Sequence, residues 1–404
     1  LTKVDALVES GVIFAKGGLK NFLKMPTLIL SGKSRLKSRI ADYCIPDASL
    51  LPYNDDVIGL IEERSSKGDE VFLVTAADQR IADSVTSQFD NFVRGVGSSE
   101  DVNLKGEVKA SYLVEKFGKG GFDYVGDSKS DIPVWKMARY GFCVNSRMAR
   151  IMPDNCSLLS SGSGSKIMSV LPRMLRMKQW VKNLLVFLPI LLHESFPRND
   201  ELLDGFFAMI GFCFFASSVY ILNDTMDVEM DRKHPRKSKR PIASGEVSII
   251  SSLVLMAALL GSSSTMMLLL GKVEVLLLLI SYFMLNIIYS TFLKTVVVID
   301  VMILSIFYTM RIIAGSISSE ISLSIWLFVF SIFIFTSLGF LKRHSSLVLK
   351  GKEGESLLLG RGYTPDDLAV VSSMGAASGM LSALVVSLYI DSEAANANFQ
   401  SQEF

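Results

Sequence analysis

The chain has few of the residues that most often build metal centres and covalent cross-links. It contains 4 cysteines and 3 histidines among 404 residues. The cysteines are scattered without a CxxC pair, which argues against a zinc ribbon and indicates reduced, structural cysteines. His193, His234 and His344 lie far apart in the sequence. A histidine zinc site or a histidine-based nucleophile relay therefore finds no support in the sequence.

The chain also has almost no net charge, no signal peptide and no initiator methionine. The net charge of +1 averages a polar first part and an apolar second part, so it says nothing about partners. We expect no nucleic acid partner. The chain opens with LTKVDALVES and ends with a polar stretch. We expect that both ends belong to a longer protein.

Beyond about residue 165, apolar runs long enough to cross a membrane follow one another. Basic residues gather at the connections on one side, whereas the other side has only Arg198 and Lys272. By the positive-inside rule the basic side is cytoplasmic, together with the region that precedes the first run. The seven predicted membrane helices lie near 181–193, 202–222, 249–270, 274–292, 296–315, 322–341 and 367–390.

The Asp-rich segment, Asn223–Gly245, reads NDTMDVEMDRKHPRKSKRPIASG and follows a long apolar run. Asp224, Asp227 and Asp231 are spaced i, i+3 and i+7, so a continuous helix would present all three on one face. Mg²⁺ takes oxygen ligands from carboxylates and phosphates, so this face predicts a Mg²⁺-bridged diphosphate. The alternative is a solvated loop whose charges only set topology. The cations that would neutralise the remaining charge are Arg232, Lys233, Arg236, Lys237, Lys239 and Arg240.

A second polar cluster is predicted on the same cytoplasmic side. Tyr289, Lys294 and Asp300 surround the connection between the fourth and fifth membrane helices. Arg311 lies deep in the fifth, where an unpaired cation is costly and usually functional. A structural ion pair between Asp300 and Arg311, and an interfacial position for Tyr289, are the alternatives. At the mouth of the first helix the sequence QWVKN adds Lys178, Lys182 and Asn183, for whose lysines snorkelling at the interface is the alternative.

Together, the Asp-rich segment with its HPRKxxRPxASG continuation and the YSxxLKxxxxxD cluster resemble the UbiA-type intramembrane prenyltransferases. The wording of QWVKN and HPRK is most similar to the phosphoribosyl-transferring branch of that family. The resemblance covers about 172–390 and implies an all-helical bundle with a cytoplasm-facing cavity, in a bacterial inner membrane, with two further membrane helices. It assigns metal and diphosphate binding to Asn223, Asp224, Asp227 and Asp231, and a second motif to Tyr289, Lys294 and Asp300.

The reaction implied by the resemblance releases diphosphate beside a lipid. In the phosphoribosyl version, a polyprenyl phosphate oxygen attacks C1 of 5-phosphoribosyl diphosphate, and Asp300 could stabilise the oxocarbenium-like sugar. Mg²⁺ is the expected cofactor, and no strong general base is needed. The alternative is an aromatic prenyltransferase that uses a polyprenyl diphosphate; a membrane transporter is a weaker one. A second phosphate pocket would favour the phosphoribosyl version. Its candidates are Lys178, Lys182 and Arg240, and the other predicted substrate contacts are Asn183, Asn223, Lys237 and Arg311.

Residues 1–155 predict a soluble α/β domain. Glu70–Thr75 and Phe122–Val125 have the composition of buried parallel strands, and Glu107–Phe117 is helical in pattern. This alternation is typical of a doubly wound, Rossmann-like sheet. The Gly/Ser-rich run at 160–166 indicates a linker. The predicted domains are the soluble domain at 1–155, a linker at 156–171, the membrane domain at 172–390 and a polar tail at 391–404.

Polar residues follow the predicted strands of the soluble domain. Thr75 could bond a phosphoryl oxygen, and Lys109, more than Lys105, could pair with a nucleophilic carboxylate. Asp127 and Asp131 are spaced to orient Mg²⁺ at the carboxyl edge of the sheet. In this order the residues resemble motifs II, III and IV of the haloacid-dehalogenase-like phosphatases. A small helical cap is expected between about 12 and 65.

Motif I of those phosphatases, a strand that ends in DxDGT, is absent from the sequence. It supplies both the nucleophile and the general acid, and Asp5 alone cannot do both tasks. We therefore expect this domain to be truncated and this chain to lack phosphatase activity. In the intact protein the domain could act on a phosphate, such as that of a phosphoribosylated lipid. A role in regulation or assembly is the alternative.

Overall fold

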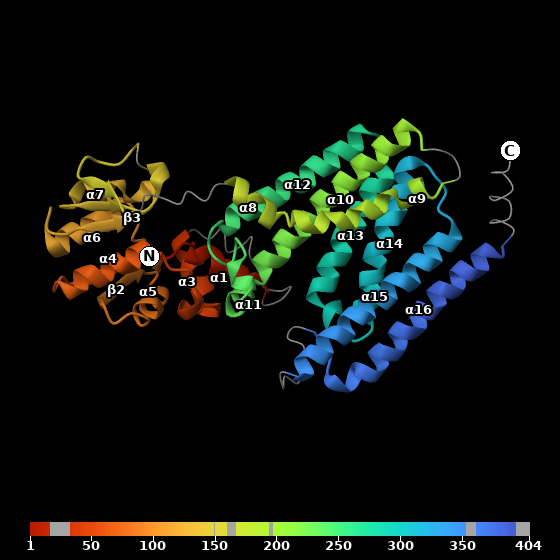
Figure 1. The fold of residues 1–404 in the computed structure, drawn as a ribbon. Coiled ribbons are helices and arrows are strands. Elements are labelled where there is room, and N and C mark those ends of the chain that lie inside the picture. The colour runs from red at the N-terminus through yellow and green to blue at the C-terminus, as the bar shows by residue number, and fades with distance from the viewer. Residues whose placement is uncertain (17–32, 149, 160–166, 194–196, 353–360, 393–404) are drawn as a thin grey trace. The chain divides into compact units, whose positions relative to one another are not determined.

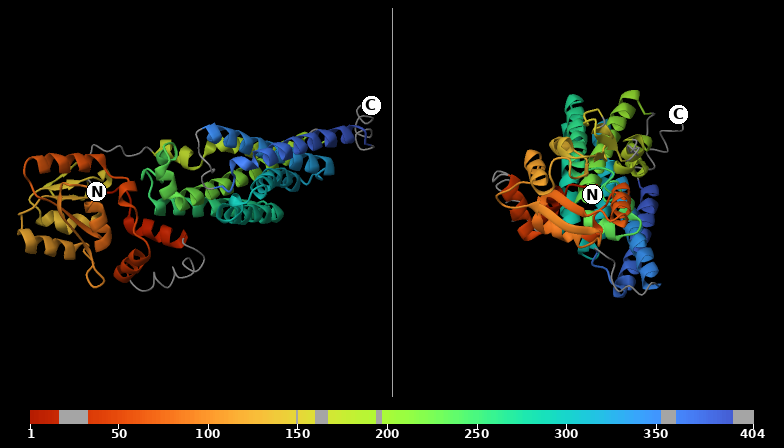
Figure 2. Two further views of the ribbon diagram at one scale, coloured as in Figure 1. Left: turned by 90° about the horizontal axis from the view of Figure 1, so that it is seen from below. Right: turned by 90° about the vertical axis from the view of Figure 1, so that its left-hand side faces the viewer.

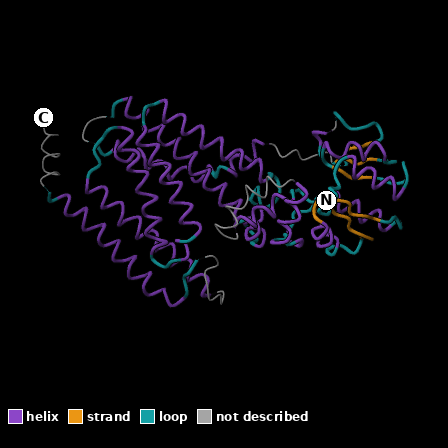
Figure 3. Tube along the Cα trace, turned by 180° about the vertical axis from the view of Figure 1, so that it is seen from behind, coloured by secondary structure: helices purple, strands orange, loops and turns teal. Residues whose placement is uncertain are grey.

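The structure is a computed structural model that describes residues 1–16, 33–148, 150–159, 167–193, 197–352 and 361–392. The chain divides into two compact units. The first unit comprises Leu1–Met174 and Asp224–Val254, and the second comprises Leu175–Asn223 and Leu255–Phe404. Figure 3 shows strands only in the first unit. The predicted linker at 160–166 and most of the predicted tail lie outside the described residues, so those boundaries stay predictions.

The first unit combines short helices with short strands (Figure 1). The helix predicted at Glu107–Phe117 is α6, and an acidic first turn and Lys116 in its last turn complement the helix dipole. The α-helices are α1 (Ala6–Lys16), α3 (Lys33–Tyr43), α4 (Asp55–Ser66), α5 (Gln79–Thr86), α6 (Glu107–Phe117), α7 (Ile132–Met137), α8 (Ile167–Met174) and α11 (Val228–Lys233). The 3-10 turns are η1 (Ala48–Leu50), η2 (Lys129–Asp131), η3 (Ser146–Met148) and η5 (Lys237–Lys239).

Two small parallel sheets stand where one doubly wound sheet was predicted. One sheet pairs β1 (Val71–Asp78) with β2 (Phe92–Ser98), and α5 connects them. The other has the order β3-β4-β5, from β3 (Tyr124–Gly126), β4 (Gly141–Cys143) and β5 (Cys156–Leu158). Parallel pairing within each sheet is confirmed, but the single Rossmann-like sheet of a haloacid-dehalogenase domain is not, because β1 and β2 do not pair with β3, β4 or β5.

The second unit is helical throughout its described residues (Figure 2). Within the described parts of the chain, six helices are long and apolar enough to cross a membrane. They confirm six of the predicted spans and a multi-pass membrane bundle. They are α10 (Asn199–Met226), α12 (Ile249–Leu269), α13 (Val273–Thr291), α14 (Ile299–Ser319), α15 (Ile325–Lys352) and the segment Pro365–Ile390, which contains η7 (Pro365–Asp367) and α16 (Leu368–Ile390).

The first predicted membrane helix, 181–193, is wrong. This stretch forms a 3-10 helix, η4 (Met177–Phe187), and the four-residue helix α9 (Leu188–Leu191). At about 1.5–2 Å per residue, such a stretch is too short for a hydrocarbon core of about 30 Å. Asn183 is also buried within it by a polar contact, so the segment packs against the bundle as a short element.

The packing of the second unit centres on α10, α13 and α14. Phe212, Leu279 and Ala314 are buried in one apolar cluster, and Tyr282 packs edge-on between Phe212 and Phe307. Helices α15 and α16 lie side by side as an antiparallel pair, as Figure 1 shows. The outer apolar surfaces of the bundle remain exposed, which suits contact with lipid.

Candidate functional site

The Asp-rich segment folds as a series of tight turns in the first unit. Helix α10 ends at Met226, Asp227 has φ −97° and ψ 15°, and α11 starts at Val228. The predicted continuous helix with three aspartates on one face is therefore wrong at Asp227. Past α11, backbone bonds join Ser238 to His234 and Ser244 to Arg240. The segment is an ordered structure, which argues against a bare solvated loop.

Two of the three aspartates still converge on one point. Nη1 of Arg240 donates to Oδ1 of Asp224 at 3.0 Å and to Oδ2 of Asp231 at 2.5 Å. Asp231 is 2% and Asp224 is 7% exposed. The turn η5 brings Arg240 to this position, because its backbone N–H bonds the carbonyl of Lys237. One cationic group thus bridges two buried carboxylates, as a bound cation would.

A divalent cation fits this arrangement. Mg²⁺ in substrate-bound sites typically uses one or two protein carboxylates and completes its shell with phosphate oxygens and water. Among the described residues, no group of three or more His, Cys, Asp or Glu side chains is placed to hold a metal. Asp224 and Asp231 would therefore share the ion with a diphosphate substrate, and Arg240 would have to withdraw from between them.

The remaining predicted residues of this segment are less buried than the pair. Asp227 and Asn223 are partly exposed, and Lys237 is exposed. Asn223 falls at the end of the second unit's first stretch, whereas the three aspartates belong to the first unit. The binding roles of these residues stay predictions.

Asp300, in the second unit, is the centre of a buried ionic network. It is fully buried near the N-terminus of α14. Its Oδ2 accepts from Nε of Arg343 at 2.5 Å, and its Oδ1 accepts from Nη1 of Arg361 at 2.8 Å. The hydroxyl of Tyr289 donates to Oδ1 at 2.6 Å and accepts from Arg361 at 3.1 Å. Tyr289 and Asp300 are thus in contact, as their shared motif predicts.

The short sequence Arg361-Gly362-Tyr363 positions this network. A Cβ atom on Gly362 would lie 1.9 Å from the carbonyl oxygen of Thr295, so only glycine allows this approach. The buried hydroxyl of Tyr363 accepts from the N–H of Val298, which has a strained φ of 70°. The segment therefore fixes the start of α14 and delivers the guanidinium of Arg361 to Asp300.

Arg343 and Arg361 are site residues that no motif in the sequence marks, and there they are only two of the basic residues on the predicted cytoplasmic side. With them, the network carries an excess of positive charge around one carboxylate. Burial alone would lower the pKa of Arg361, but Tyr289 and Asp300 outweigh that effect and hold the pKa above its ordinary value. Lys294 lies in the nearby turn η6 (Leu293–Thr295), half-buried.

Arg311 is buried in α14 among neutral groups. Its Nε donates to Oδ1 of Asn183 at 2.8 Å and its Nη2 to the hydroxyl of Tyr282 at 3.2 Å. Its guanidinium also lies over the rings of Phe212 and Tyr308, at 5.4 and 5.6 Å. An ion pair between Asp300 and Arg311 was one alternative, but Asp300 pairs with Arg343 and Arg361. The predicted contact residues Asn183 and Arg311 touch each other.

The predicted lysines of the first segment differ in their surroundings. Lys178 is exposed. Lys182 donates to Oε1 of Gln179 at 3.4 Å, and its ammonium lies 5.8 Å from the ring centroid of Tyr308. The guanidinium of Arg311 lies 5.6 Å from the same ring centroid, so Tyr308 is near two cations in the second unit.

The predicted phosphatase-like residues are partly brought together in the first unit. Nζ of Lys109 lies 3.6 Å from Oδ1 of Asp131, and the hydroxyl of Tyr124 joins them at 2.9 Å to each. Oδ2 of Asp131 accepts from the N–H of Asp127 at 3.3 Å. The hydroxyl of Thr75 accepts from the nearby N–H of Ala77, and Lys105 is exposed.

The surroundings shift the pKa values of the two carboxylates of this cluster, Asp127 and Asp131, in opposite directions. Burial and the neighbouring Asp131 raise the pKa of Asp127. Burial acts the same way on Asp131, but Lys109 and hydrogen bonds from Ser128 and Tyr124 hold its pKa below the ordinary value. Burial lowers the pKa of Lys109. Such divergent pairs are typical of acid–base and metal sites.

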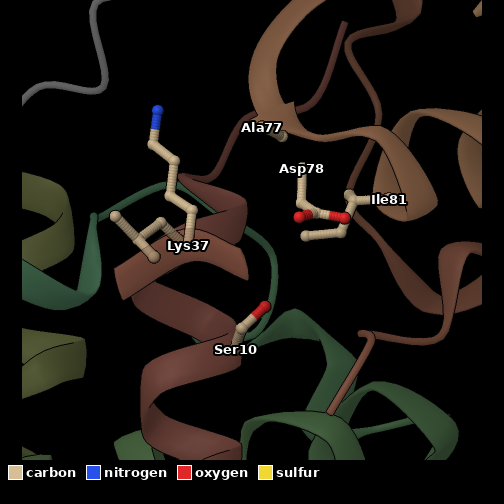
Figure 4. A pocket seen from close by; sticks show the side chains of 6 residues that line it. Ser10, Lys37, Ala77, Asp78 and Ile81 are labelled. Atoms are coloured by element: carbon tan, nitrogen blue, oxygen red, sulfur yellow. The ribbon is translucent and has the colours of Figure 1, made fainter. Parts of the chain in front are cut away.

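A small pocket lies at the carboxyl end of β1 (Figure 4). It contains none of the predicted site residues. Figure 4 shows Asp78 beside Ile81, with Ser10 and Lys37 on neighbouring helices. Nζ of Lys37 bonds Oδ1 of Asn103 at 2.9 Å, which ties α3 to the loop after β2. The pocket is lined by Leu7, Ser10, Lys37, Ala77, Asp78 and Ile81.

Several known proteins are similar to this chain. The profile of the UbiA prenyltransferase family matches residues 188–348. An uncharacterized protein, y4nM of Sinorhizobium fredii, is 33% identical over 368 residues, which cover 89% of this chain and 70% of that protein. Decaprenyl-phosphate phosphoribosyltransferase of Mycobacterium tuberculosis is 32% identical over 214 residues, or 51% of this chain and 70% of the enzyme. A UbiA homologue from Archaeoglobus fulgidus, solved with GPP and Mg²⁺, aligns with a TM-score of 0.45 at 18% identity, covering 55% of this chain and 78% of that structure.

Proposed function

The chain belongs to the UbiA prenyltransferase family, and we propose that it transfers phosphoribosyl from 5-phosphoribosyl diphosphate to a polyprenyl phosphate, with release of diphosphate. As a family member with six membrane-spanning helices among its described residues, it is a multi-pass membrane transferase. We propose a bacterial inner membrane location with a cytoplasmic N-terminal domain. The proposed partners are the polyprenyl lipid, the sugar diphosphate and the bilayer.

The observation that carries the proposal is the convergence of Asp224 and Asp231 on Arg240. Bound there, Mg²⁺ would supply neutralising charge to the leaving diphosphate. Asp224 and Asp231 would hold the ion, and Arg240, once displaced, would be free to contact a phosphate oxygen. In the reaction, an oxygen of the lipid phosphate forms a bond to C1 of the sugar while the bond from C1 to the diphosphate breaks. The electron pair leaves with the diphosphate, and no proton has to move.

The choice of phosphoribosyl over prenyl transfer rests on charge. A phosphoribosyl donor and a lipid phosphate together carry more phosphate groups than a prenyl diphosphate and an aromatic acid do. Within the second unit, the side chain of Arg361 is 33% exposed, so it is available to an added phosphate group. The name of the mycobacterial relative supports the same choice. Aromatic prenyl transfer is the alternative.

In the test, membranes that contain the full chain are supplied with labelled 5-phosphoribosyl diphosphate, polyprenyl phosphate and Mg²⁺. Movement of the label into the organic phase, abolished by a chelator and restored by Mg²⁺, is the expected result. No movement of that label, together with transfer of a prenyl group to an aromatic acid, would select the alternative. No transfer in either assay would overturn both.

A second candidate function concerns the first unit. We propose that the cluster of Lys109, Asp127 and Asp131 is the remnant of a phosphatase-like site, because a buried lysine and two carboxylates lie at the carboxyl end of β3. Thr75 would bond the phosphoryl group. The sequence lacks a DxDGT strand, so the expected result with a phosphomonoester is no hydrolysis by this chain. Hydrolysis that Asp131→Asn abolishes would contradict that expectation.

A further inference from the structure

A buried ion pair anchors the Asp-rich segment to the first helix of the chain, inside the first unit. The guanidinium of Arg232, in α11, donates through Nη1 to Oε2 of Glu9 at 3.0 Å and through Nη2 to Oε1. Its Nε donates to the carbonyl of Ala243 at 2.9 Å. The side chains of Arg232 and Glu9 are 6% and 2% exposed. Such a two-point, fully desolvated pair fixes position as well as charge.

Further contacts seat the same segment on the N-terminal residues. Gly245, with φ 73°, comes so close that a Cβ atom there would lie 2.9 Å from Cβ of Lys3 and 3.0 Å from Cγ of Pro52. Helix α11 also contacts the turn η1. Helix α11 and Gly245 of the Asp-rich segment therefore both lie against the N-terminal residues of the same unit.

The pair lies next to the proposed metal site in the chain. Arg232 directly follows Asp231, and both belong to the six-residue helix α11. Glu9 holds Arg232, and Arg240 bridges Asp231 to Asp224. Because Arg232 and Asp231 are neighbours on so short a helix, a movement of one displaces the other. Loss of Glu9 would leave Arg232 buried without a counter-ion, which is strongly destabilising. The way to relieve it is for α11 to move toward water.

We propose that Glu9 is a positioning residue for the transferase, through which the N-terminal domain holds Asp231 and Arg240 in the geometry that binds the metal and diphosphate. This inference rests on the proposed function. Small displacements of catalytic groups are costly: a shift of about 1 Å can reduce the rate about 100-fold. Helix α1 would therefore serve the proposed metal site of the same unit.

The test compares Glu9→Gln with the charge swap Glu9→Arg/Arg232→Glu in the full chain. Hydrogen exchange of residues 228–247 is measured with and without Mg²⁺ and inorganic diphosphate, and kcat and KM are measured with 5-phosphoribosyl diphosphate. The matched control is Asp123→Asn, which removes an exposed ion pair of the same unit, Arg139 with Asp123.

For Glu9→Gln we expect exchange in 228–247 and the KM for the diphosphate substrate each to rise about 10-fold or more, as loss of a buried partner implies. The swap should recover much of both, and the control should change neither. Unchanged exchange and KM in Glu9→Gln would overturn the proposal. If Glu9→Gln unfolds the first unit, the swap and Arg232→Lys decide between the outcomes. Recovery of both the fold and the KM in these variants supports the proposal. Recovery of the fold without recovery of the KM overturns it.

Failure of this inference can be told from failure of the proposed function. If the wild-type chain transfers no phosphoribosyl, the proposed reaction is wrong, but protection of 228–247 by Mg²⁺ and diphosphate still reports on the site. If that protection is the same in wild type and Glu9→Gln, Glu9 does not position the site.

Discussion

Nη1 of Arg361 donates to Oδ1 of Asp300 at 2.8 Å, and 61 residues of sequence separate the two. Arg343 donates to both oxygens of the same carboxylate, through Nε to Oδ2 and through Nη2 to Oδ1. The two arginines differ in burial: the side chain of Arg343 is 4% exposed and that of Arg361 is 33% exposed. This difference assigns Arg343 to the stability of the bundle and leaves Arg361 able to reach a ligand.

Replacement of the two arginines should therefore have separable effects. Arg343→Met should destabilise the chain by about 3–5 kcal/mol, because it leaves Asp300 buried with one partner fewer. Arg361→Gln should cost less stability than Arg343→Met. It should lower transfer activity by more than its small fall in melting temperature would explain. Thermal unfolding in detergent and transfer assays on the same preparations measure both. Equal loss of stability in the two variants would contradict the assignment.

Gly362→Ala should lower both stability and activity. Its methyl group would meet the carbonyl of Thr295, so the segment would have to move and would carry Arg361 away from Asp300. The matched control is Gly261→Ala in α12, where an added methyl points into open space in the described structure. That change should be neutral or slightly stabilising, since alanine favours a helix by about 1 kcal/mol over glycine. Melting temperatures that fall equally for both variants would argue against the packing explanation.

Asp224→Asn and Asp231→Asn should each reduce transfer at least about 100-fold, the scale for loss of one electrostatic contact to a transition state. The reason is that each removes a carboxylate from the pair that converges on Arg240. Asp204→Asn is the control, because Asp204 pairs with Lys272 outside the predicted site. The initial rate of label transfer at saturating Mg²⁺ is the measurement. Survival of activity in either site variant would remove the metal assignment.

Stability of the first unit should depend on Asp131 in a pH-dependent way. Its pKa lies below the ordinary value, so its carboxylate form stabilises the fold at neutral pH. That contribution is complete above the ordinary pKa of about 3.9 and is lost as the pH falls through the lower folded-state pKa. Asp131→Asn should cost about 3 kcal/mol near pH 7, since Lys109 loses its partner. The cost should shrink below about pH 4.

Hydrogen exchange of α6, which carries Lys109, follows this unit within the full chain. Asp123→Asn serves as the control, because the ion pair of Asp123 with Arg139 is more exposed than that of Asp131 with Lys109 and should contribute little stability. A cost of Asp131→Asn that stays constant from pH 7 into acid would show that the carboxylate contributes no charge-dependent stability.

The sequence by itself determined six of the membrane helices, the parallel pairing of the N-terminal strands and the grouping of Tyr289 with Asp300 at one helix connection. Apolar length, β-branched runs and short polar motifs are local properties, and they act over a few residues. It placed Asp224, Asp227 and Asp231 on one helix, but no local rule signalled the break at Asp227. The apolar content of 181–193 likewise suggested a span that its short 3-10 helix does not make.

Only the tertiary structure decided which charges meet. Arg240 reaches Asp224 through a turn, Arg361 reaches Asp300 across two helices of the sequence, and Arg232 finds Glu9 over 223 residues. A charge in a sequence looks the same whether it faces water or a buried partner, because its partner is chosen by the packing of distant segments. Burial then sets how much free energy is lost when a pair is broken, since an unpaired buried charge is strongly destabilising.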